Sequence, residues 1–160
     1  MNEIRAKHYV FPPPERHQLD NARARGVPDA VLEFYELCDG ALIGAGSDFS
    51  DPNGRQYRLR IPHLAEVQST QSYGYIFDDS PLFTSSACWW QIVDYCDANW
   101  LAYDGTPASP GRIMNVYHET VGELGSHEIV ASSIPDLLER LLDRGGVYWF
   151  DGDFHSLGAI

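Results

Sequence analysis

The sequence predicts an α+β fold in which helices flank a central antiparallel sheet. Three short runs in the middle of the chain, residues 89–95, 100–104 and 112–118, are rich in the aromatic and β-branched residues that suit strands. The turns between them are short and polar, so the strands are expected to run antiparallel as a meander. Helical patterns precede and follow this block instead of alternating with it, which disfavours a parallel α/β sheet.

Two helices are expected before the meander, at residues 15–25 and 28–38. Pro28 suits the first turn of the second helix, and Asp39-Gly40 ends it. Apolar residues recur in that helix at helical spacing, which predicts a face packed on the core. The first ten residues are expected to be loosely attached, because chain ends fray unless other elements hold them.

Two strands should follow, a short one at residues 41–43 and a half-buried one at 56–61. Between them, residues 44–54 form a turn-rich loop that lacks the complete spacing of a phosphate-binding or a calcium-binding loop. Residues 62–67 are predicted to start a short helix, and residues 82–88 are expected to be loop.

The clearest helix runs from Ser133 to Arg144, after an expected strand at residues 128–131. Ser133 and Asp136 have the spacing of an N-terminal capping box. The helix carries an apolar stripe at i, i+3, i+4, i+7 and i+8, formed by Ile134, Leu137, Leu138, Leu141 and Leu142. A further strand is predicted at residues 147–150.

The length of 160 residues predicts one domain, with a core at residues 27–150 and peripheral segments at 1–14 and 151–160. No apolar run approaches the ~20 residues of a membrane span, and no leader-like segment opens the chain. Three cysteines without metal-ligand spacing indicate free thiols, so we expect a cytoplasmic protein that contacts no membrane.

The chain is strongly acidic, with a formal net charge of −12, and its charges are segregated. Residues 26–54 and 61–111 each contain six Asp or Glu and neither Lys nor Arg. Such a chain repels phosphate backbones, which disfavours direct nucleic-acid binding. It would attract a basic protein partner, although acidity can also serve solubility alone.

Catalytic and metal-binding motifs are incomplete. His118-Glu119 is not followed by the second histidine of a zinc-protease helix, so only a looser site from Asp104, His118 and His127 stays open. Cys88 and Cys96 lack a local activating motif and are expected to be buried small side chains. We therefore expect no enzyme activity, no cofactor and no metal.

Trp89 and Trp90 are adjacent in a predicted strand, so they must point to opposite faces of the sheet. One of them should fill the core. The other should be exposed or covered by the segment at residues 82–86, and an exposed tryptophan would be a candidate for binding a partner.

Set in order along the chain, these landmarks resemble the SUKH superfamily. The opening helix reads VPDAVLEFY and ends at Asp39-Gly40, as in that family. The resemblance continues through segments at residues 57–67, 90–104, 111–119 and 129–138. The turn at residues 96–99, the Trp89-Trp90 pair and the proline-rich start depart from the family pattern.

The resemblance implies an α+β fold with an antiparallel sheet and a protein-binding role without catalysis. Bacterial members of the family resemble immunity proteins, which bind and neutralise toxins, often nucleases. The resemblance implies a toxin as the partner, and the acidic stretches of the chain favour a basic toxin domain. The residues expected to contact it are Asp78, Asp79, Trp89, Asp94, Asp97 and Asp104.

A second function stays open at this point. The same family includes cytoplasmic regulators of the yeast Smi/Knr type, so the chain could be a regulatory or scaffold domain without a toxin partner. Fold alone does not choose between the two functions.

Overall fold

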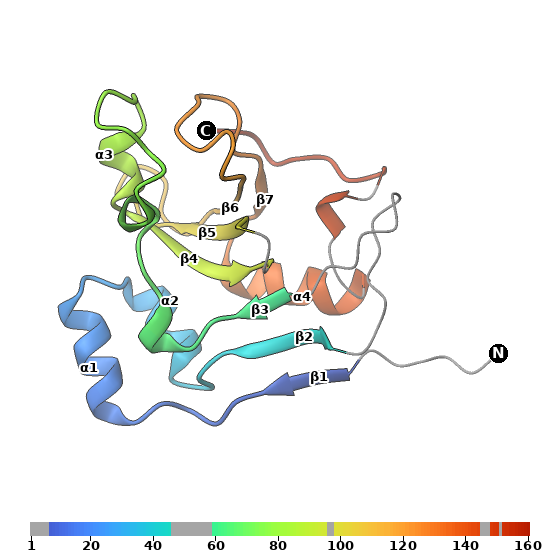
Figure 1. Ribbon diagram of the computed structural model, residues 1–160. Helices are drawn as coiled ribbons and strands as arrows, with labels where there is room; N and C mark the ends of the chain where they lie inside the picture. Colours follow the sequence, from blue (N-terminus) through green and yellow to red (C-terminus); the bar gives the residue numbers. More distant parts are fainter. Residues whose placement is uncertain (1–6, 46–58, 96–97, 145–147, 151) are drawn as a thin grey trace.

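The computed structural model describes residues 7–45, 59–95, 98–144, 148–150 and 152–160. It confirms the α+β fold, with a seven-stranded antiparallel sheet and four α-helices in the described chain (Figure 1). The strands are β1 (Lys7–Val10), β2 (Ala41–Ala45), β3 (Leu59–Ile61), β4 (Trp89–Asp94), β5 (Trp100–Asp104), β6 (Ile113–Val116) and β7 (Ile129–Ala131). The helices are α1 (Arg16–Ala24), α2 (Asp29–Tyr35), α3 (Phe83–Ser86) and α4 (Ile134–Arg144), with 3-10 turns η1 (Leu64–Glu66), η2 (Thr70–Tyr73) and η3 (Tyr148–Phe150).

The sheet is a meander, because every strand pairs antiparallel with the next strand along the chain. One edge is β1. The other edge, β7, is covered by the end of the chain, where the Ile129 amide donates to the Gly158 carbonyl at 2.8 Å. Covering a strand in this way satisfies its backbone groups and blocks edge-to-edge aggregation.

Both faces of the sheet are buried, each by its own apolar cluster. The larger cluster includes Trp90 and the inner faces of α2 and α4. The smaller cluster contains Trp89, Trp100 and Met114, and Leu82 before α3 packs into it. Strand alternation therefore separates Trp89 from Trp90 as predicted.

One half of the predicted capping box is present at the N-terminus of α4, where the Asp136 carboxylate binds Ser132 in place of the Ser133 amide. The Asp136 amide donates to Ser133 Oγ at 3.2 Å, and the Asp136 carboxylate accepts from the Ser132 amide at 2.8 Å. Ile134, Leu137 and Leu141 are buried, whereas Leu138 is half-buried and Leu142 is 60% exposed. The predicted five-residue stripe was therefore too wide at Leu142, because the sheet covers only part of the helix surface.

This difference gives a matched pair of substitutions. Leu141→Ala should lower the free energy of unfolding by about 3 kcal/mol, because it removes a fully buried side chain and leaves a cavity. Leu142→Ala should change it by about 0.5 kcal/mol or less, as surface substitutions do. Urea denaturation of both variants measures the difference, and similar losses would contradict this assignment of the helix faces.

Three predictions of local structure were wrong. Lys7–Val10 form an edge strand on β2 instead of a loose end. Residues 83–86, expected to be loop, form a single helical turn, α3, which packs over Trp89. Tyr148–Phe150 form a 3-10 turn and not a strand, and the Tyr148 hydroxyl donates to the Val130 carbonyl at 2.6 Å. A run of three or four apolar residues does not distinguish strand from helical turn.

The helix expected at residues 28–38 is shorter than predicted. It ends at Tyr35, and the Asp39 carboxylate then accepts from the Leu64 amide at 2.7 Å. The strand expected at 56–61 is present at Leu59–Ile61, while residues 56–58 lie outside the described chain, as does the loop at 46–54. Within the described ranges, no helix has the length and apolarity that crossing a lipid bilayer requires.

Candidate functional site

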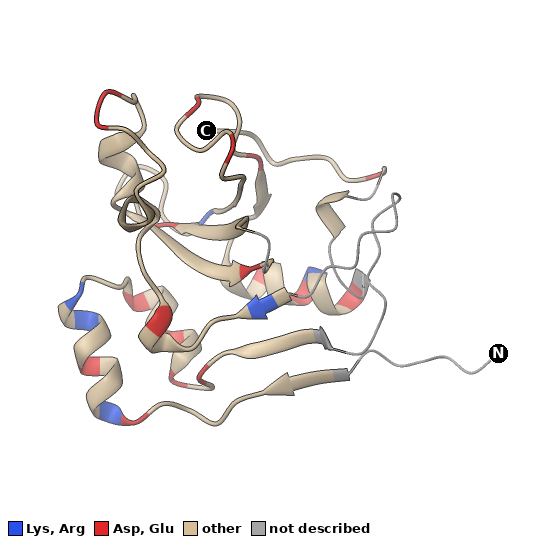
Figure 2. Ribbon diagram, viewed as in Figure 1, with Lys and Arg blue, Asp and Glu red and all other residues tan. Residues whose placement is uncertain are grey.

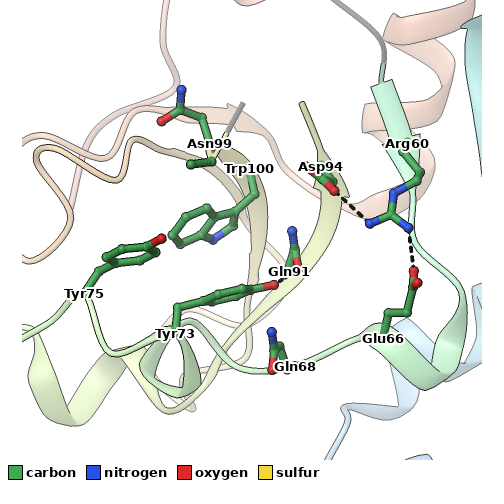
Figure 3. Close-up of a pocket in the computed structure, with 10 residues that line it drawn as sticks. Arg60, Glu66, Gln68, Tyr73, Tyr75, Gln91, Asp94, Asn99 and Trp100 are labelled. Atoms are coloured by element: carbon green, nitrogen blue, oxygen red, sulfur yellow. Dashed lines mark hydrogen bonds and ion pairs between the residues drawn. The ribbon is translucent and has the colours of Figure 1, made fainter. Parts of the chain in front are cut away.

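A pocket of about 450 Å³ opens on the face of the sheet that carries Trp89 (Figure 3). Its floor comes from β4 and β5, and its rim comes from β3 and the segment between η1 and Tyr75. The described residues that line it are Arg60, Glu66, Gln68, Tyr73, Tyr75, Gln91, Asp94, Ala98, Asn99 and Trp100.

Three aromatic rings form one wall of this pocket. The ring centroids of Tyr73 and Trp100 lie 4.9 Å apart, and those of Tyr75 and Trp100 lie 6.2 Å apart. Trp100 is 2% exposed at the back of the wall, whereas Tyr75 is 44% exposed at its mouth. The planes of Tyr73 and Tyr75 differ by 11°, so the wall presents similarly oriented ring faces.

The opposite side of the pocket is charged. Arg60 donates to Glu66 Oε2 at 2.6 Å and to Asp94 Oδ2 at 2.8 Å, so one guanidinium links two carboxylates (Figure 3). Two carboxylates against one guanidinium leave one negative charge in excess among the described lining residues. The Arg60 side chain is about one third exposed, so its ion pairs are partly screened by water.

Between the two walls, Gln91 places a buried carboxamide at the floor of the pocket. Gln91 is 8% exposed, and its Oε1 accepts a hydrogen bond from the Tyr73 hydroxyl. Burial raises the pKa of the Tyr73 phenol, so this hydroxyl remains a neutral donor at physiological pH. The hydrogen bond fixes the Tyr73 ring against Trp100.

Local sequence explains why these groups meet. Gln91 and Trp89 differ by two positions in β4 and share a face, and Trp100 in β5 lies on that same face. A bulge between Gln91 and Val93 shifts the register of β4, and Asp94 beyond it also lines the pocket. The η2 turn brings Tyr73 over the sheet, where the Trp100 indole donates to Thr70 Oγ1 at 3.3 Å.

The structure separates the six residues expected to contact a partner. Asp94 lies in the pocket, and Asp78 and Asp79 are exposed on the loop that follows Tyr75. Trp89 and Asp104 are both fully buried, so neither can contact a partner in this fold. That correction has a physical cause: α3 covers Trp89, and Asp104 is bound to Arg112 at 2.7 Å. Asp97 lies outside the described residues.

The looser metal site considered from the sequence does not assemble. Asp104 Oδ1 accepts from the Thr106 amide and hydroxyl, and the exposed His118 contacts Asn99. His127 is buried against Trp89, with 5.3 Å between ring centroids. No cluster of three potential metal ligands occurs among the described residues.

Sequence reasoning missed the pocket itself. Tyr73 and Tyr75 belong to a short apolar run at residues 73–77, and Arg60 lies in the strand predicted at 56–61. Neither pattern reveals that Tyr73 and Tyr75 pack against Trp100 of β5. All four tryptophans are buried in the described structure, so no exposed tryptophan marks the site.

Comparison with known proteins yields one informative similarity. The chain is 26% identical over 153 residues to Immunity protein YokJ of Bacillus subtilis (strain 168). The aligned region covers 90% of this chain and 78% of YokJ. This similarity points to an immunity-type protein. No family model and no solved structure matches the chain.

Beneath the face that carries the pocket, His127 makes stability sensitive to acid. The ring is fully buried, and its Nε2 accepts from the Gly122 amide at 3.3 Å. Burial lowers the pKa of His127 to about 4. The backbone of Asn115 opposes this decrease only in part, because His127 Nδ1 makes no hydrogen bond in the described structure. The unfolded chain, with a His pKa near 6.5, therefore takes up the proton first as the pH falls.

The free energy of unfolding should thus fall by about 3 kcal/mol through His127 between neutral pH and pH 4. The contribution is fully present above about pH 6.5. Denaturant unfolding across this range should show a flatter pH dependence for His127→Gln, while the exposed His118→Gln keeps the wild-type slope. Equal slopes in wild type and His127→Gln would contradict this role of His127.

Proposed function

We propose that this chain is a SUKH-type immunity protein, which neutralises a bacterial toxin by binding it directly and without catalysis. The observation that carries the proposal is the similarity to Immunity protein YokJ over most of both chains. The segments that resemble the SUKH superfamily belong to the single α+β fold described above. We therefore take residues 1–160 as one domain of this type, and we expect it to act in the cytoplasm.

The charge of the molecule supports a basic toxin domain, such as a nuclease, as the partner. The net charge is −12, and residues 61–111 contribute six acidic side chains without Lys or Arg. In the described chain, basic side chains lie mainly on or beside α1, on β3, before β6 and on α4 (Figure 2). Complementary charge accelerates association and makes it sensitive to salt.

The face that carries the pocket is the proposed contact surface. It combines the pocket with the exposed loop of Asp78 and Asp79. Phe77 in that loop is 75% exposed and adds apolar area. Asp97 is included for its position in the sequence, between Asp94 and Asn99. Interfaces commonly join such an aromatic centre to a charged rim.

The decisive experiment is a test of protection. The toxin candidate is the protein encoded beside this chain in its genome, expressed in cells with and without the chain. The chain should restore growth, and the purified pair should co-elute at low salt and separate more readily at high salt. A chain that neither protects the cells nor binds the toxin is not its immunity protein.

A tagged copy retrieved from its native lysate distinguishes the alternative. A small basic protein that salt releases agrees with toxin binding. A housekeeping assembly recovered in its place, with no protection in the growth assay, would identify the regulatory or scaffold function of the Smi/Knr type instead.

A further inference from the structure

We propose that the pocket receives the side chain of a tyrosine presented by the toxin. In this arrangement the phenol ring lies along the aromatic wall, and its hydroxyl oxygen accepts a hydrogen bond from the Gln91 carboxamide at the floor. This inference rests on the proposed function for the identity of the partner, but the chemistry of the pocket can be tested without it.

The Gln91 carboxamide directs a hydrogen-bond donor into the pocket. Its Oε1 accepts from the Tyr73 hydroxyl, and its Nε2 points away from that hydroxyl (Figure 3). Among the described residues, none accepts a hydrogen bond from this Nε2, although Gln91 is only 8% exposed. A buried donor without a partner is costly. An occupant that excludes water from the floor must therefore supply an acceptor atom to Gln91.

The aromatic end of the pocket favours a neutral ring over a cation. Figure 3 places Tyr75 at one end and the ion pairs of Arg60 at the other, with Trp100, Tyr73 and Gln91 between them. A cation held against Tyr75 would therefore give up water without reaching a carboxylate, whereas an aromatic ring loses little on leaving water. Tyr75 is 44% exposed and its plane lies 28° from that of Trp100, so a ring can enter there and lie along the wall.

Tyrosine is the large aromatic residue that meets both requirements. Its hydroxyl oxygen accepts hydrogen bonds, whereas the indole of tryptophan only donates and phenylalanine has no polar atom in its side chain. Gln91 lies beyond Trp100 when the pocket is followed from Tyr75, so a phenol ring along the wall directs its hydroxyl toward the carboxamide (Figure 3). The volume of about 450 Å³ is that of a small-ligand site and has room for such a ring. Tyrosine is also enriched at the centres of protein interfaces.

The first test titrates the full chain with N-acetyl-tyrosine amide and follows two NMR signals, the carboxamide N–H of Gln91 and the indole N–H of Trp100. The indole donates to Thr70 at the back of the wall, so it reports on ring contacts. Tyrosine should shift both signals saturably. N-acetyl-phenylalanine amide lacks only the hydroxyl and should bind about tenfold more weakly. Equal affinities, the absence of a shift with tyrosine, or tighter binding of N-acetyl-arginine amide would overturn the proposal.

Two variants locate the binding. Tyr75→Ala removes the ring at the mouth and should weaken tyrosine binding about fivefold, whereas the matched control Phe77→Ala removes a more exposed ring that does not line the pocket. Gln91→Met removes the donor and should make the affinities for tyrosine and phenylalanine equal. Unchanged affinity in Tyr75→Ala contradicts the proposal, as does a retained preference for tyrosine in Gln91→Met. If circular dichroism shows that Gln91→Met is unfolded, the comparison of Tyr75→Ala with Phe77→Ala decides.

The second test separates this inference from the proposed function. Tyr75→Ala should weaken the complex with the toxin about tenfold, whereas Phe77→Ala weakens it less. Changing the toxin's tyrosines to phenylalanine one at a time should reveal one whose effect is lost when Tyr75 is already alanine. A toxin that binds Tyr75→Ala as tightly as the wild type would refute the tyrosine receptor and leave the immunity function intact. Tyrosine binding to a chain that binds no toxin would refute the immunity function and leave the pocket chemistry intact.

A second copy of the chain is the competing source of a tyrosine, since Tyr9 on the edge strand β1 is 53% exposed. Analytical ultracentrifugation of the chain alone should show a monomer at the concentrations of the titration. A dimer that Tyr75→Ala abolishes would assign the pocket to a second copy and overturn the toxin as its occupant.

Discussion

Replacing Gly40 with alanine should lower the free energy of unfolding by about 4 kcal/mol, enough to unfold a protein of ordinary stability. Gly40 links α2 to β2 and has φ of +93°, a backbone conformation that residues with a Cβ rarely adopt. The left-handed conformation alone accounts for about 1–2 kcal/mol of this cost.

The larger part of the cost is steric. A methyl group on Gly40 would lie 2.5 Å from the Ile61 carbonyl oxygen and 2.6 Å from that of Pro62. These backbone atoms cannot move freely, because β2 pairs with β3 there and the Tyr35 hydroxyl donates to the Pro62 carbonyl at 2.8 Å. The new methyl group would therefore disturb the contact between α2 and the sheet.

Gly74→Ala is the matched control for this substitution. Gly74 also has a positive φ, of +72°, but no atom lies within 4 Å of a methyl group placed there. Its cost should be limited to the backbone term of about 1 kcal/mol. Urea denaturation, with circular dichroism at 25 °C, measures both variants. Similar losses for Gly40→Ala and Gly74→Ala would show that the carbonyl contacts at Gly40 do not matter.

Arg112→Met should lower the free energy of unfolding by about 4 kcal/mol, because it leaves the Asp104 carboxylate buried without its counter-ion. Asp104 is fully buried at the end of β5, and its Oδ2 accepts from Arg112 at 2.7 Å. The Thr106 amide at 3.0 Å and hydroxyl at 2.7 Å occupy the other oxygen. These two hydrogen bonds cannot compensate for the lost positive charge.

The exposed pair of Arg140 and Asp136 provides the comparison. Arg140→Met removes a 2.7 Å ion pair of similar geometry, but both side chains are partly solvated, so the cost should be about 1 kcal/mol or less. Adding Asp104→Asn to Arg112→Met should recover part of the stability, since asparagine keeps an acceptor for Thr106 and carries no charge. If the double variant is less stable than Arg112→Met, the unpaired carboxylate is not the cause of the loss.

The meander could be predicted because its signals are local. Each strand is a short run of aromatic and β-branched residues, and each connection is a polar turn. The amphipathic helix near the C-terminus was equally predictable, because its capping residues and its apolar spacing all lie within twelve residues. Elements of three or four residues, such as η3 and α3, were misassigned because so short a run carries no measurable period.

The candidate site was less accessible from sequence. Asp94 and Asp104 look alike as acidic residues at strand ends, yet one lines an open pocket and the other is sealed under Arg112. The pocket also needs Tyr73 and Trp100, which are 27 positions apart and meet only because η2 crosses the sheet. The residues next to Tyr73 and Trp100 in the sequence do not indicate that η2 crosses the sheet.

By itself, the sequence determined the α+β class, the order of the central strands and the acidic character of the chain, because propensity, turn chemistry and charge act locally. The tertiary structure alone decided which carboxylates face solvent and which aromatic rings form a wall. It also decided which glycine has no room for a methyl group. Those properties depend on contacts between segments far apart in the chain. A carboxylate that could contact a partner when exposed instead stabilises the fold when it is buried beside a counter-ion, as Asp104 is.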